Sequence, residues 1–353
     1  MPTTVGIETT GDDAGIEHFI RGLPKTDLHI HLEGSIEPEL MLTLADRNGI
    51  SLPWSSTAAL RSAYHFEDLQ SFLDLYFAGC RVLVHERDFY DVTLAYLERA
   101  VVDGVIRAEL FIGPQSFTER GVSISTLISG VLTAMDDATR KHGISIGLLI
   151  SAHRHRSEAD ALALLDSILP WSNRILGVGL GGAEAGNPPS KFERFFHAAR
   201  KKGFHTTVHA GEEGPAAYVR EAIELLQVDR IDHGITCRDD PALVEDLAAM
   251  AIPLTVCPLS NLKLKVVQSL ETHPLKTLLD AGLRVTINSD DPPYFGGYVS
   301  ENLIACRQAL GLSVSDIVQL ARNGFSSAFI SQDEADAGIG SIDAYLDEHV
   351  AFS

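Results

Sequence analysis

Short apolar runs alternate with longer amphipathic stretches along most of this chain. Eight runs rich in Val, Ile and Leu have the length of buried strands: residues 26–31, 106–112, 145–150, 175–180, 205–209, 230–233, 253–256 and 284–288. Helical periodicity marks six segments between them: residues 123–141, 157–169, 192–202, 216–226, 241–250 and 275–281. Gly143, Gly203 and Gly282 follow three of these segments, where helices commonly end. Eight strands alternating with helices predict a (β/α)8 TIM barrel.

An open, doubly wound sheet is the alternative architecture for such a pattern. No G-x-G-x-x-G follows the first strand, and polar residues follow most of the strands instead of gathering at one switch point. Both observations favour the closed barrel.

The segment between the first two strands is too long for a single connection. Residues 33–104 contain helical patterns at 40–48, 67–79 and 88–103. Because barrel active sites lie at the C-terminal ends of the strands, this insertion is expected over the mouth, as a lid that excludes water. The aromatic and apolar side chains at near-helical spacing in it are expected to pack its own core, although one or two of them could cover a bound substrate: Phe66, Phe72, Leu75, Tyr76 and Phe77.

The remaining segments complete the expected domain organisation. Residues 1–22 are expected to form an N-terminal tail, and residues 23–353 a single barrel domain. Extra helices after residue 300 are expected to pack on the outside of the barrel. The oligomeric state is left open, with a homo-oligomer among the alternatives.

Composition narrows the function classes. The chain has 353 residues, a net charge of −20 and 45% hydrophobic residues, enough for one large core. An acidic surface repels nucleic acid and anionic membranes, so a small neutral or cationic substrate fits better. No bilayer-spanning stretch, signal peptide or C-x-x-C pair is found, and a cytoplasmic location is expected.

The first strand ends in a His-x-His motif. Residues i and i+2 of a strand share a face, so Asp27, His29 and His31 are predicted on one face, with Leu28 and Ile30 on the other. Buried polar groups need partners, and a cation would supply one. A water-facing strand with two solvated histidines is the competing interpretation of this motif alone.

Three further strand ends carry histidines or carboxylates, and a barrel would bring all of them to one mouth. Imidazoles with one carboxylate suit Zn²⁺ better than Mg²⁺ or Ca²⁺. The predicted zinc ligands are His29, His31, His209 and Asp290. Zinc would lower the pKa of a coordinated water to about 7. Glu212, His233 and Asp291 remain to move protons and orient groups.

These motifs resemble those of the adenosine and adenine deaminase branch of the metal-dependent amidohydrolases. The matching stretches are HIHLEGS (29–35), HAGE (209–212), RIDHG (230–234), CPLSN (257–261) and NSDDP (288–292). The resemblance extends over nearly the whole chain from Leu23 onward. It implies a zinc-dependent hydrolysis that releases ammonia from C6 of a purine.

The resemblance also implies a role for each site residue. Glu212 would donate a proton to ring N1, and His233 and Asp291 would orient and deprotonate the water. Asp291 would also contact N7, and the backbone of Gly182 would contact N3. Adenosine-specific members have an Asp at the position of Glu33, and that Asp contacts the ribose. A Glu at this position is typical of the adenine branch, which this chain therefore resembles. The expected reaction is therefore adenine to hypoxanthine plus ammonia.

Two strand ends depart from the adenine branch. Residues 179–184 (GLGGAE) lack an expected Asp and Ser, and residues 112–117 (IGPQSF) lack an expected Asp and His. Smaller and apolar residues there leave open adenosine, another adenine-containing nucleoside or an N6-substituted adenine as the substrate.

Two other functions use the same residues differently. One is an amide or lactone hydrolase on the same scaffold. The other is a non-catalytic purine-binding or signalling protein, against which the retention of every proposed zinc ligand and of Glu212 argues. A second His-x-His, His153 and His155, is flanked by arginines that disfavour another dication; it is expected in a loop, with His155 as a candidate for lining the pocket.

Overall fold

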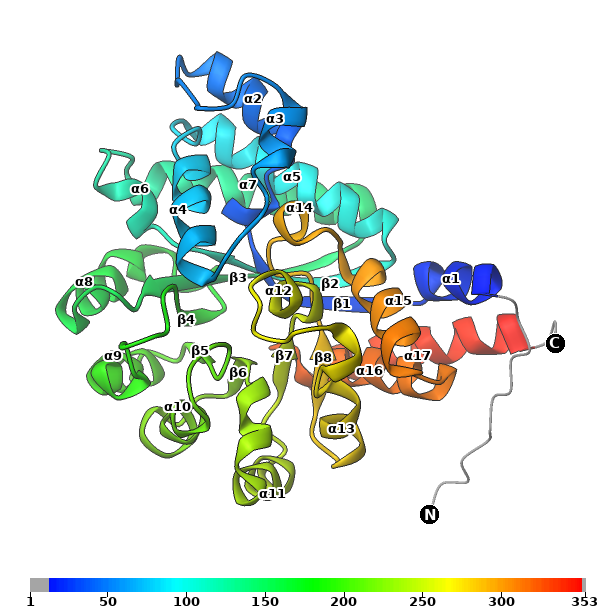
Figure 1. Cartoon of the computed structure of the whole chain (residues 1–353). Coiled ribbons are helices and arrows are strands. Elements are labelled where there is room, and N and C mark those ends of the chain that lie inside the picture. Colours follow the sequence, from blue (N-terminus) through cyan, green and yellow to red (C-terminus); the bar gives the residue numbers. More distant parts are fainter. Residues whose placement is uncertain (1–12, 351–353) are drawn as a thin grey trace.

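Eight parallel strands form the centre of the molecule (Figure 1). The computed structural model describes residues 13–350. Neighbouring strands pair in chain order from β1 to β8, which confirms the predicted (β/α)8 barrel. The strands are β1 (Lys25–His31), β2 (Val105–Ile112), β3 (Ser145–His153), β4 (Gly177–Gly181), β5 (His205–Ala210), β6 (Arg230–His233), β7 (Leu254–Val256) and β8 (Val285–Ile287).

The barrel closes between the first and last strands. The His31 N–H donates to the Asp290 carbonyl at 3.0 Å, and the Asp290 N–H donates to the His29 carbonyl at 2.9 Å. These two hydrogen bonds place residues from opposite ends of the sequence side by side at the barrel mouth.

Helices follow the strands and cover the outside of the barrel (Figure 1). Those that follow β2 to β7 are α6 (Gln115–Thr118), α7 (Ile124–His142), α8 (Glu158–Ile168), α9 (Glu193–Lys201), α10 (Ala216–Glu221), α11 (Pro241–Met250), α12 (Pro258–Lys263) and α13 (Leu275–Asp280). Shorter helical turns are η2 (Leu169–Trp171), η3 (Pro189–Phe192), η4 (Ala222–Leu226), η5 (Ile235–Asp239) and η6 (Leu270–Thr272). Helix α7 shows why these segments are helical: Ser123 caps its first turn, and Gly143, at φ 72°, ends it.

The insertion after β1 and the C-terminal helices lie where the sequence indicates. The insertion contains η1 (Glu33–Ser35), α2 (Pro38–Arg47), α3 (Thr57–Ser62), α4 (Leu69–Cys80) and α5 (Glu86–Val102). After β8 come α14 (Pro292–Phe295), α15 (Val299–Leu310), α16 (Val314–Ser327) and α17 (Gln332–Val350). Helix α16 packs on the barrel, where Asn323 donates to the Val285 carbonyl at 2.9 Å.

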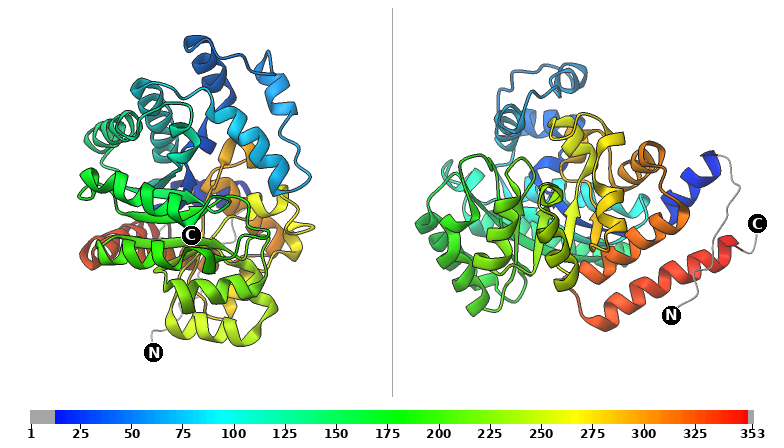
Figure 2. Two further views of the ribbon diagram at one scale, coloured as in Figure 1. Left: turned by 90° about the vertical axis from the view of Figure 1, so that its left-hand side faces the viewer. Right: turned by 60° about the horizontal axis from the view of Figure 1, so that its bottom comes forward.

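The expected N-terminal tail includes a helix. Residues 13–22 form α1 (Asp13–Gly22), while residues 1–12 lie outside the described part of the chain. Helices α1 and α17 lie near each other at one side of the barrel (Figure 2). The Tyr345 hydroxyl of α17 donates to the Phe19 carbonyl of α1 at 3.0 Å. Among the described residues, no helix is long and apolar enough to cross a membrane.

A buried ionic network fills the N-terminal end of the barrel. Glu109 receives hydrogen bonds from Arg107 at 2.8 Å and Arg230 at 2.6 Å. Burial alone would raise the pKa of Glu109, but the two guanidinium groups hold it below its usual value. Because these charged groups are already paired with one another, we look for reactive groups at the other end of the barrel, where the strands have their C-terminal ends.

The predicted alternation of β1 is wrong at Asp27. A register shift between Asp27 and Ile30 interrupts the pairing of β1 with β2. Asp27 consequently accepts hydrogen bonds from Tyr96 of α5, at 2.9 Å, and from the Ser289 hydroxyl. It therefore supports the segment next to Asp290 and does not line the pocket described below.

Candidate active site

A pocket opens among the C-terminal ends of the strands, beneath helix α4. Strand ends supply its polar side, and α4 together with Phe295 supplies much of its apolar side. The lining residues are His31, Leu69, Phe72, Leu73, Tyr76, Phe77, Gly113, Ser151, His153, Gly181, Gly182, His209, Glu212, His233, Leu264, Asp290, Asp291 and Phe295. Most of the residues predicted for the site thus lie around one cavity.

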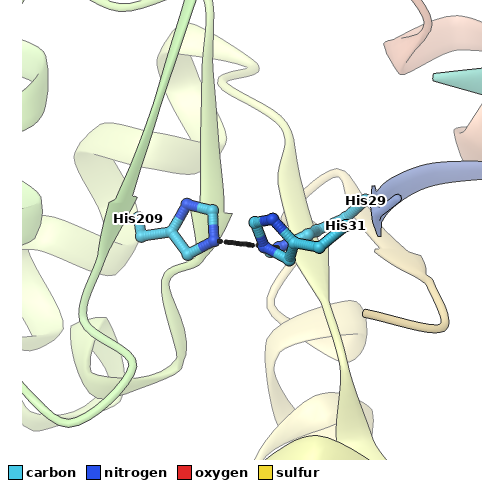
Figure 3. Close-up of side chains that lie close together, drawn as sticks. All are labelled: His29, His31 and His209. Carbon is cyan, nitrogen blue, oxygen red and sulfur yellow. Dashed lines mark hydrogen bonds between the residues drawn. The ribbon is translucent and has the colours of Figure 1, made fainter. Parts of the chain in front are cut away.

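Three imidazoles meet at the base of this pocket. Figure 3 shows His209 of β5 facing His29 and His31 of β1. The Nε2 atoms of His29 and His31 are 3.4 Å apart, and that of His209 lies 3.1 Å from His29 Nε2 and 3.0 Å from His31 Nε2. Tetrahedral zinc with Zn–N bonds of about 2.0–2.1 Å places its ligand nitrogens about 3.3 Å apart. The spacing of the three nitrogens therefore fits a shared zinc ion.

Asp290 completes this ligand set from the segment that follows the last strand. Its Oδ1 lies 3.7 Å from His29 Nε2 and 3.5 Å from His31 Nε2. The backbone of Asp290 has a φ of 61°, a conformation that is uncommon for a residue with a side chain. This strained backbone turns the carboxylate toward the imidazoles and favours a metal-binding role.

The protonation of the imidazoles also suits a metal. Burial, reinforced by the charge of the neighbouring His209, lowers the pKa of His31 to about 3 and that of His29 well below its usual value. Both side chains are therefore neutral near pH 7, and neutral imidazole is the form that binds metal ions.

A second set of groups holds the imidazoles in place from behind. Asp232 Oδ2 lies 3.1 Å from His209 Nδ1. Asp232 Oδ1 accepts hydrogen bonds from Thr207 at 2.7 Å and Thr255 at 3.0 Å, and the Thr255 hydroxyl lies 3.1 Å from His29 Nδ1. Partners on Nδ1 leave the Nε2 lone pairs directed at the metal position.

Sequence reasoning assigned no role to these supporting residues. Asp232 pairs in register with His209 across β5 and β6. Thr207 and His209 are two residues apart on one strand, and this spacing predicts that their side chains share a face, so it could have identified Thr207. The strand register that brings Asp232 and Thr255 to them cannot be read from one sequence.

Glu212 lies at the pocket wall with two other proton-handling candidates. Its Oε1 is 3.7 Å from His233 Nε2, which is itself 3.9 Å from Asp290 Oδ2. Burial, followed by the nearby charges of Asp290 and Glu184, raises the pKa of Glu212 well above its usual value. Burial also raises the pKa of Asp291 and lowers that of His233 to about 3. A carboxyl whose pKa is raised thus lies beside an imidazole that is neutral near pH 7.

The two remaining predicted substrate contacts differ in position. Gly182 lines the pocket with a φ of 93° at the end of β4. Glu33 is buried next to the pocket without lining it, and its Oε1 accepts from the N–H of the lining residue Gly113 at 2.6 Å. Burial raises the pKa of Glu33 to about 7.

Two expectations about the pocket walls need correction. Phe72, Tyr76 and Phe77 all line the pocket, whereas their spacing favoured packing within the insertion, with one or two of them covering the substrate. His153 also lines it, at the end of a β3 that is longer than predicted, whereas His155 does not. The Phe77 and His153 rings are 5.6 Å apart, so the insertion and β3 meet at the pocket.

Comparisons with known proteins agree with this geometry. The adenosine deaminase family profile matches residues 24–345. A protein from Rhodopseudomonas palustris named adenine deaminase is 65% identical over 338 residues, covering 96% of this chain and 98% of its own. Another from Sphingopyxis alaskensis, with the same name, is 54% identical and covers 93% of this chain and 96% of its own.

Two solved structures are similar over nearly the whole chain. The adenine deaminase of Arthrobacter aurescens has a TM-score of 0.90 and 46% identity, covering 92% of this chain and 99% of its own. An amidohydrolase from Burkholderia ambifaria, solved with bound Zn, has a TM-score of 0.89 and 30% identity, covering 99% of this chain and 98% of its own. Together with the profile match over most of its length, these similarities show that the chain belongs to the adenosine deaminase family.

Proposed function

We propose that this chain deaminates adenine hydrolytically to hypoxanthine and ammonia, with one zinc ion held by His29, His31, His209 and Asp290. The observation that carries the proposal is the meeting of three imidazole nitrogens, each within 3.4 Å of the other two, beside buried Glu212 in one pocket. Relatives named adenine deaminase that match almost the whole chain support it.

The reaction forms a C6–O bond and breaks the bond from C6 to the exocyclic nitrogen. Zinc, when bound, supplies the Lewis acidity that makes a water molecule nucleophilic near neutral pH. Glu212, which burial keeps protonated, donates its proton to ring N1 and so makes C6 more electrophilic. Asp291 orients the attacking water, and His233 accepts a proton from it and passes this proton to the exocyclic amino group, which leaves as ammonia. The remaining hydroxyl proton returns to Glu212 when the C6 carbonyl forms.

The pocket wall suits a flat, uncharged base. Phe72, Tyr76 and Phe295 provide apolar and aromatic surface, and a base of this shape fills such a site without needing counter-charges. Among the described residues that line the pocket, none is Lys or Arg, so the phosphate of a nucleotide would find no cation there. These features favour a free base or nucleoside over a nucleotide.

Glu33 favours the free base over the nucleoside, and Gly182 leaves room for the base itself. Glu33 is held by the Gly113 N–H beside the pocket, and its side chain, longer than that of Asp, would leave less room for an attached sugar. At Gly182 the absence of a side chain lets the backbone approach ring N3.

Ammonia release from a panel of purines tests the function. Zinc-loaded protein is supplied with adenine, adenosine, AMP and N6-methyladenine, and parallel reactions contain amide and lactone substrates. We expect kcat/KM for adenine to exceed that for adenosine by at least about 100-fold, the size that one or two unmatched polar contacts produce. Equal turnover of adenosine would overturn the substrate assignment, and hydrolysis of the lactones alone would overturn the reaction.

A further inference from the structure

Glu184 is a buried carboxylate to which the reaction described above assigns no step. It lies three residues beyond the end of β4, and its side chain has no exposed surface. Its oxygens are surrounded by backbone N–H groups of the turn that follows β5, the turn that carries Glu212.

Four consecutive backbone N–H groups donate to this one carboxylate. Oε1 accepts from Gly211 at 2.7 Å. Oε2 accepts from Glu212 at 3.0 Å, Glu213 at 3.0 Å and Gly214 at 2.8 Å. Successive N–H groups that converge in this way form a concave anion site, here filled by a side chain of the same protein.

The position of the carboxylate is tightly defined. A Cβ atom on Gly214 would lie 2.6 Å from Glu184 Cδ, so only a glycine leaves room for the carboxylate at this place in the turn. Arg154, which is also fully buried, lies 4.0 Å from Glu184 Oε1 and donates to the His209 carbonyl. A positive charge therefore compensates the buried carboxylate.

We propose that Glu184 is a positioning residue that fixes the 211–214 turn and thereby directs the Glu212 side chain at the substrate. This role rests on the proposed deaminase function. The four hydrogen bonds hold the backbone atoms on both sides of Glu212, so its Cα–Cβ direction depends on them. A displacement of about 1 Å in a reacting group can cost about 100-fold in rate.

Glu184→Gln tests this proposal in the zinc-loaded enzyme. Glutamine has the same shape, but its amide group is a donor and would face at least one N–H of the turn. We expect kcat with adenine to fall about 10- to 100-fold, with KM changed less than about threefold and zinc content unchanged. Glu213→Gln is the matched control, because it removes an exposed charge from the same turn while its amide oxygen can still accept from the Ala185 N–H, and its kcat should stay within about twofold of wild type.

A double-mutant cycle separates positioning from a general loss of structure. If Glu184 acts through Glu212, Glu184→Gln should change kcat less than about threefold in a Glu212→Gln background. An equal loss of kcat in both backgrounds, or a parallel loss of zinc, would overturn the proposal. Gly214→Ala, whose methyl group would displace the carboxylate, should reproduce the selective loss of kcat if Glu184→Gln does not fold.

Amide hydrogen exchange provides a readout independent of catalysis. Peptides that contain residues 211–214 should exchange at least about tenfold faster in Glu184→Gln than in wild type. Unchanged exchange there would overturn the positioning role even in an active enzyme. If the wild-type holoenzyme released no ammonia from adenine, the proposed function would fail, and the exchange result would still decide whether Glu184 holds the turn.

Discussion

The contact between Asp232 and His209 allows a quantitative prediction about metal affinity. Asp232 is fully buried, with Oδ2 3.1 Å from His209 Nδ1 and Oδ1 bonded to two threonine hydroxyls. Burial alone would raise the pKa of Asp232, but its interactions with His209 hold it below the usual value. This carboxylate therefore keeps the His209 proton on Nδ1 and leaves Nε2 free to bind a metal.

Asp232→Asn should preserve the fold but reverse this preference. The Asn oxygen can still accept from both threonines, and its amide group then faces His209 Nδ1 as a donor. Nδ1 must become the acceptor, so the proton moves to Nε2, the atom that faces His29 and His31. Supporting partners of this kind are worth about 10- to 100-fold in metal affinity, or about 1.4–2.7 kcal/mol. Because the pair is buried, no water can replace the lost acceptor, and we expect the upper part of this range.

Competition with a chelator of known zinc affinity measures the effect. Excess zinc should restore much of the lost activity, because the catalytic groups themselves are unchanged. Asp229→Asn is the matched control: Asp229 also contacts a threonine and lies 3.9 Å from a histidine, His205, but at the opposite end of the barrel. Wild-type zinc affinity in Asp232→Asn, or an equal loss in Asp229→Asn, would refute the reasoning.

Three further predictions follow from other parts of the structure. Glu212→Gln should retain zinc and adenine binding but lose about 10²–10⁴-fold in kcat, and wild-type turnover would exclude Glu212 as the proton donor. Gly34→Ala would place a Cβ atom 1.4 Å from Asp291 Oδ1 and should lower kcat/KM by more than about 100-fold, whereas Gly340→Ala, with no atom near its Cβ, should not. Burial lowers the pKa of Lys25 to about 8, and unfolded lysine titrates near 10.4, so the unfolded state binds more protons between these pH values. The Tm of wild type should therefore rise relative to that of Lys25→Met between about pH 8 and 10. A Tm difference between the two proteins that does not change with pH would contradict this.

The local patterns of the sequence determined most of the fold prediction. Strand and helix periodicities are local properties, and the predicted β6 and α11 agree with the structure at both ends. The ligand set could be proposed because histidines and carboxylates stand at strand ends, and a barrel brings strand ends together.

What the sequence could not predict depends on contacts between distant segments. The register shift that turns Asp27 toward α5 leaves no mark in the local alternation. The aromatic residues of α4 have the spacing of core residues, and only the packed insertion shows that Phe72 and Tyr76 face the pocket. Glu184 bonds to backbone N–H groups, which every residue except proline has, so no side-chain pattern identifies its partners.

The junction between β1 and β8 has a consequence for the biosynthesis of the enzyme. Two of the histidines belong to the first strand, and the carboxylate of Asp290 lies three residues after the last strand. Two backbone hydrogen bonds join the segments. A ribosome delivers the histidines early and Asp290 only after most of the polypeptide has emerged. Prematurely terminated products that lack β8 would therefore be inactive. Deaminase activity requires that translation has passed this strand.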